Sequence, residues 1–181
     1  MIYKYTKIGI LCTALISGLA LSGCGEQGGG DANSSGAKSA TEKSAQPAAR
    51  SDLPVKKLVI TGNDQMKYDL TKLEAKAGQQ IELVFKNAGT MPKQSMGHNW
   101  CLLKQGTDGQ AFLEPGFAFA GNEYIAPEVA DQVIVRTKIL GPGEEETLTF
   151  VAPAEAGDYP YICTFPGHFS AGMQGILQIT E

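Results

Sequence analysis

From residue 53 onward, short runs of apolar or alternating apolar and polar residues recur between turn signals. The runs are rich in Val, Ile, Leu, Thr, Tyr and Phe, which favour β-strands. The predicted strands are residues 55–61, 80–87, 98–103, 132–140, 145–151, 159–164 and 174–180, with a further irregular strand at residues 69–77. Turns are expected at Gly-Pro-Gly, residues 141–143, and at Ala-Gly-Asp, residues 156–158. Many short strands at this spacing predict an all-β fold, an antiparallel β-sandwich.

One stretch of the folded part, residues 107–130, does not follow a strand pattern. Glycine and proline interrupt it five times, at Gly109, Pro115, Gly116, Gly121 and Pro127. We expect a flap over the sandwich that covers apolar surface, with a short helix near residues 108–113 or 124–130.

The first residues have the pattern of an exported lipoprotein. Lys4 and Lys7 precede an apolar run at residues 8–21, which is too short for an ordinary membrane span. The run ends in Leu-Ser-Gly-Cys, residues 21–24, which looks like a bacterial lipobox. This predicts removal of a signal peptide, residues 1–23, and acylation of Cys24 with a lipid such as palmitate. Gly25 after that cysteine favours the outer membrane. The alternative is a plain secretory signal with an incidental cysteine.

Residues 24–52 are predicted to be a flexible tether between the lipid and a single domain at residues 53–181. The stretch is rich in Gly, Ser and Ala and has no aromatic residue, so it cannot bury enough apolar surface to fold. As a coil it would span roughly 30 Å. Removal of the signal peptide takes away Lys4 and Lys7. The mature chain then has 13 Lys and Arg residues and 19 Asp and Glu residues, a net charge of −6. This charge argues against partners such as nucleic acid or anionic lipid.

The residues most informative about function lie near the C-terminus. Cys163, His168 and Met173 are spaced Cys-x4-His-x4-Met, and the only other histidine of the chain is His98. Two imidazoles, a thiolate and a weak thioether are the ligand set of a blue-copper electron-transfer site. The same residues could hold zinc, but a structural zinc site would then need a methionine as its fourth ligand, which is unusual. A buried thiol beside a surface histidine is the remaining alternative.

The cysteine count leaves no disulfide within the mature chain if one of the two remaining cysteines binds a metal ion. Cys12 leaves with the signal peptide and Cys24 carries the lipid, so only Cys101 and Cys163 remain. If Cys163 binds copper, Cys101 has no partner and is expected to be a small buried hydrophobe. The alternative role for Cys101 is an extra metal ligand. Its neighbour Trp100 is expected to lie in the core rather than to relay electrons.

Several short motifs resemble the azurin and auracyanin branch of the cupredoxins. They are Gly-Asn-Asp-Gln-Met at residues 62–66, Met-Gly-His-Asn-Trp at 96–100, Thr-Lys at 137–138, Thr-Phe at 149–150 and Cys-Thr-Phe-Pro-Gly-His at 163–168. The resemblance implies a Greek-key β-sandwich of about eight strands with one copper ion near one end. The chain departs from azurins in having four residues rather than three between His168 and Met173, and in lacking their N-terminal disulfide.

The resemblance also implies roles for individual residues. His98 and His168 would bind copper through Nδ1 and Cys163 through its thiolate. Met173 would be a weak axial ligand, with the Gly97 carbonyl at the opposite axial position.

Around these ligands, the resemblance places a second group of residues. The side chains of Asn99 and Thr164 would tie the ligand segments together, and Phe165 would lie beside them. Hydrogen bonds near the cysteine sulfur tune the reduction potential of such sites.

Electrons are expected to leave through the ring edge of His168, on an exposed loop. An uncharged patch would surround this ring and suit short-lived contacts with partners. Its predicted members are Met66, Met91, Met96, Phe165, Pro166, Gly167 and Phe169. The alternative for the three methionines is that they fill the core.

Together these features predict a monomeric electron carrier, tethered in the bacterial cell envelope, with its domain facing the periplasm or the cell surface. Its partners would be redox proteins such as cytochromes or copper and haem enzymes. An enzyme such as a copper nitrite reductase would need further histidines, and a copper store would need more ligand clusters. A copper-binding or host-interaction role at the cell surface remains the alternative.

Overall fold

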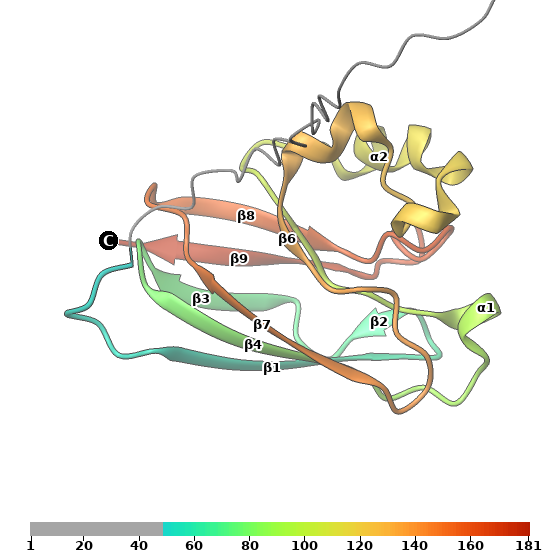
Figure 1. Cartoon of the computed structure of the whole chain (residues 1–181), viewed down its shortest axis with the longest axis horizontal. Helices are drawn as coiled ribbons and strands as arrows, with labels where there is room; N and C mark the ends of the chain where they lie inside the picture. The colour runs from blue at the N-terminus through green and yellow to red at the C-terminus, as the bar shows by residue number, and fades with distance from the viewer. Residues whose placement is uncertain (1–48) are drawn as a thin grey trace, which may run out of the picture. The chain divides into compact units, whose positions relative to one another are not determined.

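The computed structural model describes residues 49–181. It contains two facing sheets, with strand orders β2-β1-β4-β7 and β3-β9-β8-β5-β6 (Figure 1). The strands are β1 Lys56–Asn63, β2 Lys67–Tyr68, β3 Lys72–Lys76, β4 Gln80–Asn87, β5 Cys101–Leu103, β6 Val133–Arg136, β7 Glu145–Val151, β8 Gly157–Ile162 and β9 Gln174–Thr180. The predicted β-sandwich is therefore confirmed, with nine strands.

The sandwich is mixed rather than antiparallel, which corrects the sequence-based expectation. β1 pairs with β4 in parallel, and β3 pairs with β9 in parallel, while the other pairs are antiparallel. β1 and β4 lie in the first sheet, whereas β3, which comes between them in the chain, lies in the second sheet. The chain therefore crosses to the second sheet and returns before it forms β4, and such a crossover allows β4 to run parallel to β1.

Alternating burial explains why the regular strands form where the sequence predicts them. In β4, the side chains of Ile81, Leu83 and Phe85 are fully buried and alternate with half-buried ones. β4, β7 and β9 have the predicted bounds. Trp100 is fully buried and packs on Tyr161, at a ring-centroid distance of 5.5 Å, so it is part of the core as expected.

The irregular strands are shorter than predicted. The runs at 98–103 and 132–140 shrink to β5 and β6, and the run at 69–77 shrinks to β3. Within the run at 98–103, residues 100–103 are all apolar because β5 is buried on both sides. Leu102 faces the main core, while Cys101 and Leu103 face a second cluster of apolar side chains.

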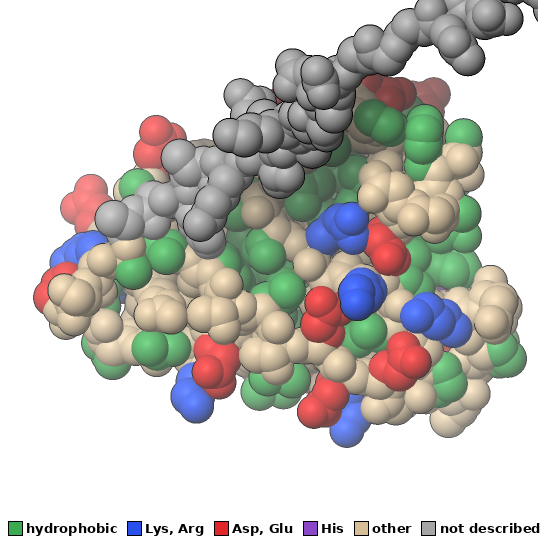
Figure 2. Space-filling view, in the orientation of Figure 1, with side chains coloured by type: hydrophobic (Ala, Val, Ile, Leu, Met, Phe, Trp, Pro, Cys, Tyr) green, Lys and Arg blue, Asp and Glu red, His purple; other side chains and the backbone are tan. Residues whose placement is uncertain are grey.

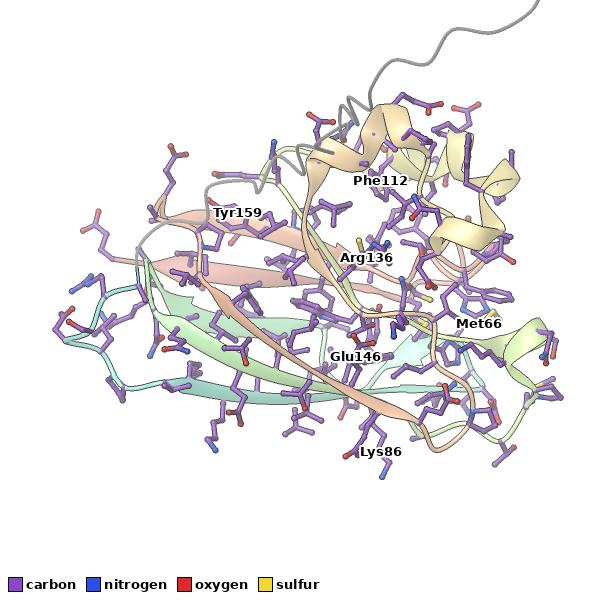
Figure 3. The ribbon with its side chains drawn as sticks, in the orientation of Figure 1. Met66, Lys86, Phe112, Arg136, Glu146 and Tyr159 are labelled. Atoms are coloured by element: carbon purple, nitrogen blue, oxygen red, sulfur yellow. The ribbon has the colours of Figure 1, made fainter. Side chains whose placement is uncertain are left out.

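The flap covers that second cluster, as predicted. It contains one α-helix, α2 Gly109–Leu113, and three 3-10 helices, Glu114–Ala118, Ala120–Asn122 and Pro127–Gln132. Asp108 caps α2 by accepting hydrogen bonds from the amides of Gln110 and Ala111, at 2.8 and 3.0 Å. Phe112, labelled in Figure 3, and Leu113 are buried in the cluster.

The predicted signal peptide, the lipidated Cys24 and residues 24–48 of the predicted tether lie outside the described residues. Within residues 49–181 no helix has the length and apolar character needed to cross a bilayer. On the face drawn in Figure 2, positive and negative side chains are interspersed rather than gathered into a field of one sign.

Candidate metal centre

His98 is held between a short helix and the sandwich. Helix α1, Lys93–Met96, ends at Gly97, and His98 then exchanges two backbone hydrogen bonds with Leu140, at 3.1 and 2.7 Å. A Cβ at position 97 would lie 2.4 Å from Ile139 Cγ2 and 2.7 Å from the Lys93 carbonyl oxygen. Only glycine therefore lets α1 pack closely enough to bring His98 to this place.

Cys163 and Met173 close the base of the loop between β8 and β9. The Cys163 amide donates to the Met173 carbonyl at 3.1 Å. Both side chains are fully buried. A Cβ at Gly62 would lie 2.7 Å from Met173 Cε, so this glycine of β1 leaves the space that the thioether side chain occupies.

The loop itself is one helical turn that ends in a Schellman motif. The Met173 amide donates to the His168 carbonyl at 2.9 Å, and the Gly172 amide donates to the Phe169 carbonyl at 2.8 Å. Gly172 has φ +94°, the left-handed conformation that this motif requires. The four residues between His168 and Met173 lie within this turn, and its hydrogen bonds connect His168 directly to Met173.

Three potential ligand side chains converge in this region. The ligand atoms of His98, Cys163 and His168 all lie within 4.8 Å of one another. The two Nδ1 atoms are 3.1 Å apart, and Cys163 Sγ is 3.5 Å from His168 Nδ1. Donor atoms bound to one first-row metal ion, with bonds of about 2.0–2.3 Å, would be separated by similar distances.

Burial favours the uncharged form of each of these groups. It raises the pKa of Cys163 to about 12, and the amides of Asn99 and Phe165 partly oppose this rise. It lowers the pKa of His168 to about 4, with a further lowering by the charge of His98. The pKa of His98 is also lowered, mainly by burial. A bound cation would supply the charge that makes the thiolate favourable.

One more feature of His98 fits a metal ligand. If Nδ1 faces the metal, the proton belongs on Nε2, and this nitrogen is buried without a hydrogen-bond partner among the described residues. Although burial lowers the His98 pKa overall, the Asn63 backbone opposes this lowering and so favours a proton on the ring. A backbone carbonyl is a common partner for the second nitrogen of a metal-bound histidine.

Comparison with known proteins also indicates a metal-binding protein. A family model described as copper binding proteins, plastocyanin/azurin family, matches residues 55–180. Azurin-1 of Alcaligenes xylosoxydans xylosoxydans is 41% identical over 127 residues, which cover 67% of this chain and 95% of that protein.

The chain belongs to the plastocyanin/azurin family of copper-binding proteins.

Other relatives in this family bear on fold and location. Auracyanin from Roseiflexus castenholzii superimposes with a TM-score of 0.61 at 32% identity, covering 70% of this chain and 98% of that chain. Azurin iso-2 from Methylomonas sp. strain J gives the same TM-score and coverage at 34% identity. Outer membrane protein H.8 of Neisseria gonorrhoeae is 36% identical over 125 residues, covering 67% of this chain and 66% of that protein.

The cofactor is copper, and His98, Cys163 and His168 are positioned as its site. Zinc, the alternative left open by the residue types, is not the metal of this family. Azurin-family proteins are electron carriers rather than enzymes, and no catalytic family is indicated for this chain.

Asn99 and Thr164, which directly follow two of these residues, are joined in the structure. Asn99 Nδ2 donates to Thr164 Oγ1 at 2.9 Å, and the Thr164 amide donates to Asn99 Oδ1 at 2.8 Å. Thr164 Oγ1 in turn donates to the Glu123 carbonyl at 2.5 Å, and the Glu123 carboxylate accepts from the Ile139 amide at 2.7 Å. Sequence reasoning missed Glu123, because the flap has no periodicity that could reveal it.

Two further residues near the site were also missed. The Tyr68 hydroxyl donates to the Asn99 carbonyl at 2.5 Å, and Lys67 Nζ donates to the Ala171 carbonyl. Both come from β2, which is only two residues long and therefore gives no recognisable strand pattern.

His168 is more buried than predicted for a residue on an exposed loop: its exposed fraction is 2%. Phe165 covers the ring, with centroids 4.7 Å apart and planes inclined by 30°. Tyr124 from the flap then packs edge-on against Phe165 at 5.5 Å. The packing of Phe165 on the ring therefore contributes to the burial of His168.

The residues of the predicted patch differ in exposure. Met91 is 41% exposed and Gly167 is open, while Met66, Met96, Phe165 and Pro166 are half-buried. Phe169 packs against the cluster under the flap, where the missing side chain of Gly109 leaves room for its ring. Figure 3 shows Met66 at the same end of the sandwich as α1.

Cys101 is free and fully buried on the flap side of β5. Burial raises its pKa to about 12. It is not part of the cluster of ligand atoms, which agrees with the predicted role of a small buried hydrophobe.

Proposed function

We propose that this protein is a membrane-tethered blue-copper electron carrier that passes single electrons between redox partners through Cu(I) and Cu(II). The observation that carries the proposal is the buried set His98, Cys163 and His168, whose ligand atoms all lie within 4.8 Å of one another. A site arranged in advance needs little movement when copper gains or loses an electron.

In this proposal His98 and His168 bind through Nδ1, Cys163 binds through its thiolate, and Met173 is a weak axial ligand. The 3.1 Å approach of the two Nδ1 atoms supports the choice of nitrogen. The backbone bonds from Met173 to Cys163 and His168 support a fixed position for the thioether. The Gly97 carbonyl would lie at the opposite axial position.

The residues around the ligands restrain both ligand segments. The paired hydrogen bonds of Asn99 and Thr164 tie the His98 segment to the Cys163 segment. The Leu140 backbone bonds hold His98 from the other side. These contacts keep the ligands in place, so that only a small reorganisation accompanies electron transfer.

We propose that electrons leave through the edge of the His168 ring. Most of this ring is covered, so a partner would approach the remaining edge next to Gly167, where no side chain stands in the way. The exposed Met91 and the half-buried Met66, Met96, Phe165 and Pro166 would form an uncharged contact surface. Such a surface suits a weak, transient encounter with a cytochrome or a copper or haem enzyme.

We also propose that Cys24 carries a lipid and that residues 24–52 tether the domain in the cell envelope. The similarity to outer membrane protein H.8 supports an envelope location. Lipid labelling tests this part: labelled palmitate should enter the wild-type protein and not Cys24→Ala. Equal labelling of the two proteins would mean that Cys24 is not the anchor.

The decisive experiment for the copper site is a visible and EPR spectrum of the protein loaded with Cu(II). A cysteine thiolate bound to Cu(II) in this geometry should give an intense blue colour and reversible one-electron reduction. A colourless Cu(II) complex would contradict the proposal.

A second candidate is a cell-surface copper-binding or host-interaction lipoprotein, and the similarity to outer membrane protein H.8 supports only its outer-membrane location. The two functions differ in their need for redox chemistry. In cells that lack the protein, wild type but not Cys163→Ser should restore electron flow between envelope redox proteins if it is a carrier. Unchanged electron flow in cells that lack the protein would favour the second candidate.

A further inference from the structure

The two-residue strand β2 contacts both ligand segments of the copper site. The Tyr68 side chain points into the core and donates to the carbonyl of Asn99, the neighbour of His98. The exposed Lys67 side chain donates to the carbonyl of Ala171, in the loop that carries His168 and Met173. Adjacent residues of a strand point to opposite faces, so one short strand can reach both segments.

The turn before β2 sets this arrangement. Asn63 pairs with Lys67 in the hairpin, and the Met66 amide donates back to the Asn63 carbonyl at 2.9 Å. Met66 adopts φ +55°, the left-handed conformation that ends a three-residue hairpin loop. This turn directs Lys67 toward the ligand loop.

Ala171 is a suitable acceptor because of the Schellman motif. The last carbonyl groups of a helical turn have no partner within the turn, and a lysine ammonium can satisfy one of them. Gly172 provides the space: a Cβ there would lie 2.6 Å from Lys67 Nζ. The ammonium therefore lies directly beside the residue that precedes Met173.

The charge of Lys67 is not neutralised by a near carboxylate. Within residues 49–181 the ion pairs with N···O distances up to 4.0 Å are Arg50–Asp52, Lys57–Glu82, Lys72–Glu74, Lys86–Glu145 and Lys93–Glu144, and none of them includes Lys67. A positive charge beside the ligand loop favours the less positive oxidation state of a metal ion bound there.

We propose that Lys67 is a positioning residue of the copper centre that caps the ligand loop at Ala171 and raises the reduction potential by favouring Cu(I). This inference rests on the proposed blue-copper function. It concerns a residue that binds no metal and that is not among the ligands or their direct neighbours in sequence.

The test compares reduction potentials of copper-loaded full-length proteins by redox titration of the blue absorption. Lys76 offers a control, since its Nζ also donates to a main-chain oxygen, that of the terminal residue Glu181, beyond the end of β9 and away from the ligand loop. We expect Lys67→Met to lower the potential, Lys67→Arg to stay near wild type, and Lys76→Met to leave the potential unchanged. The part of the decrease that is due to charge should shrink in high salt, because salt screens exposed charges.

Each outcome distinguishes this inference from the function on which it rests. A blue, reversible wild type with equal potentials for wild type and Lys67→Met at low salt would overturn the role of Lys67 alone. An equal decrease in Lys76→Met would overturn it too, since the effect would not depend on the ligand loop. A wild type without a blue Cu(II) complex would overturn both proposals.

Discussion

Asn99 and Thr164 hold each other through two buried hydrogen bonds, 2.9 and 2.8 Å long, although they are 65 residues apart in the chain. Each of them directly follows a residue of the copper site, His98 or Cys163. The pair therefore joins the two segments that must remain in register for the site to exist. Removal of this pair of hydrogen bonds should therefore lower the stability of the protein and alter the copper site.

Asn99→Ala should destabilise the protein by about 2 kcal/mol, because it leaves the buried Thr164 amide without a partner and removes the donor to the Thr164 hydroxyl. It should also shift the visible spectrum of the copper protein. Denaturant unfolding and spectra check both effects. Asn122→Ala is the control, since Asn122 also makes two side-chain hydrogen bonds, but within the flap and to Arg136. The same spectral shift in the control would argue against a specific role of Asn99.

Gly172→Ala should weaken the Met173 end of the site. The left-handed conformation costs an alanine about 1–2 kcal/mol, and the new Cβ would also meet Lys67 Nζ at 2.6 Å. Gly106→Ala separates the two effects, because Gly106 has φ +79° but no atom within 4 Å of a Cβ. Thermal unfolding should show a lower stability in both variants, while the EPR spectrum of the copper-loaded protein should change only in Gly172→Ala. An unaltered EPR spectrum in Gly172→Ala would mean that the motif does not control the ligand geometry.

The copper-free protein should lose stability as the pH falls from about 6.5 to about 4. Burial lowers the pKa of His168 to about 4 in the folded state, while in the unfolded chain it is near 6.5. The unfolded state therefore binds more protons in this window, so stability is present above pH 6.5 and is lost as the pH falls through the folded pKa. The loss should be on the order of 2–3 kcal/mol. Unfolding midpoints measured between pH 4 and 7 test this prediction. In His168→Gln, we expect the midpoint to depend less steeply on pH.

Cys101→Ser should keep the blue colour, whereas Cys163→Ser should abolish it. Cys101 is buried away from the ligand atoms, and its raised pKa, about 12, keeps it a neutral thiol. A hydroxyl in its apolar site should cost about 1–3 kcal/mol of stability. Absorption spectra and unfolding curves of the two variants check this. Loss of colour in Cys101→Ser would identify Cys101 as a ligand.

The sequence alone determined the chemistry and the regular part of the fold. Only two histidines occur in the chain, and Cys163, His168 and Met173 lie within eleven residues, so the candidate ligand types are readable from composition and spacing. The bounds of β4, β7 and β9 follow from residue type and spacing along each run, in β4 from a clear alternation of inward and outward side chains. These signals are local, so no knowledge of the fold is needed to interpret them.

Only the tertiary structure decided which distant groups meet. Lys67 reaches Ala171 across 104 positions, and Glu123 of the flap meets Thr164 across 41. The burial of His168 under Phe165 and the parallel pairing of β1 with β4 are of the same kind. Such contacts depend on how the sheets and loops pack against each other. A local sequence pattern reflects only neighbouring residues, so it does not identify the distant residues that packing brings into contact.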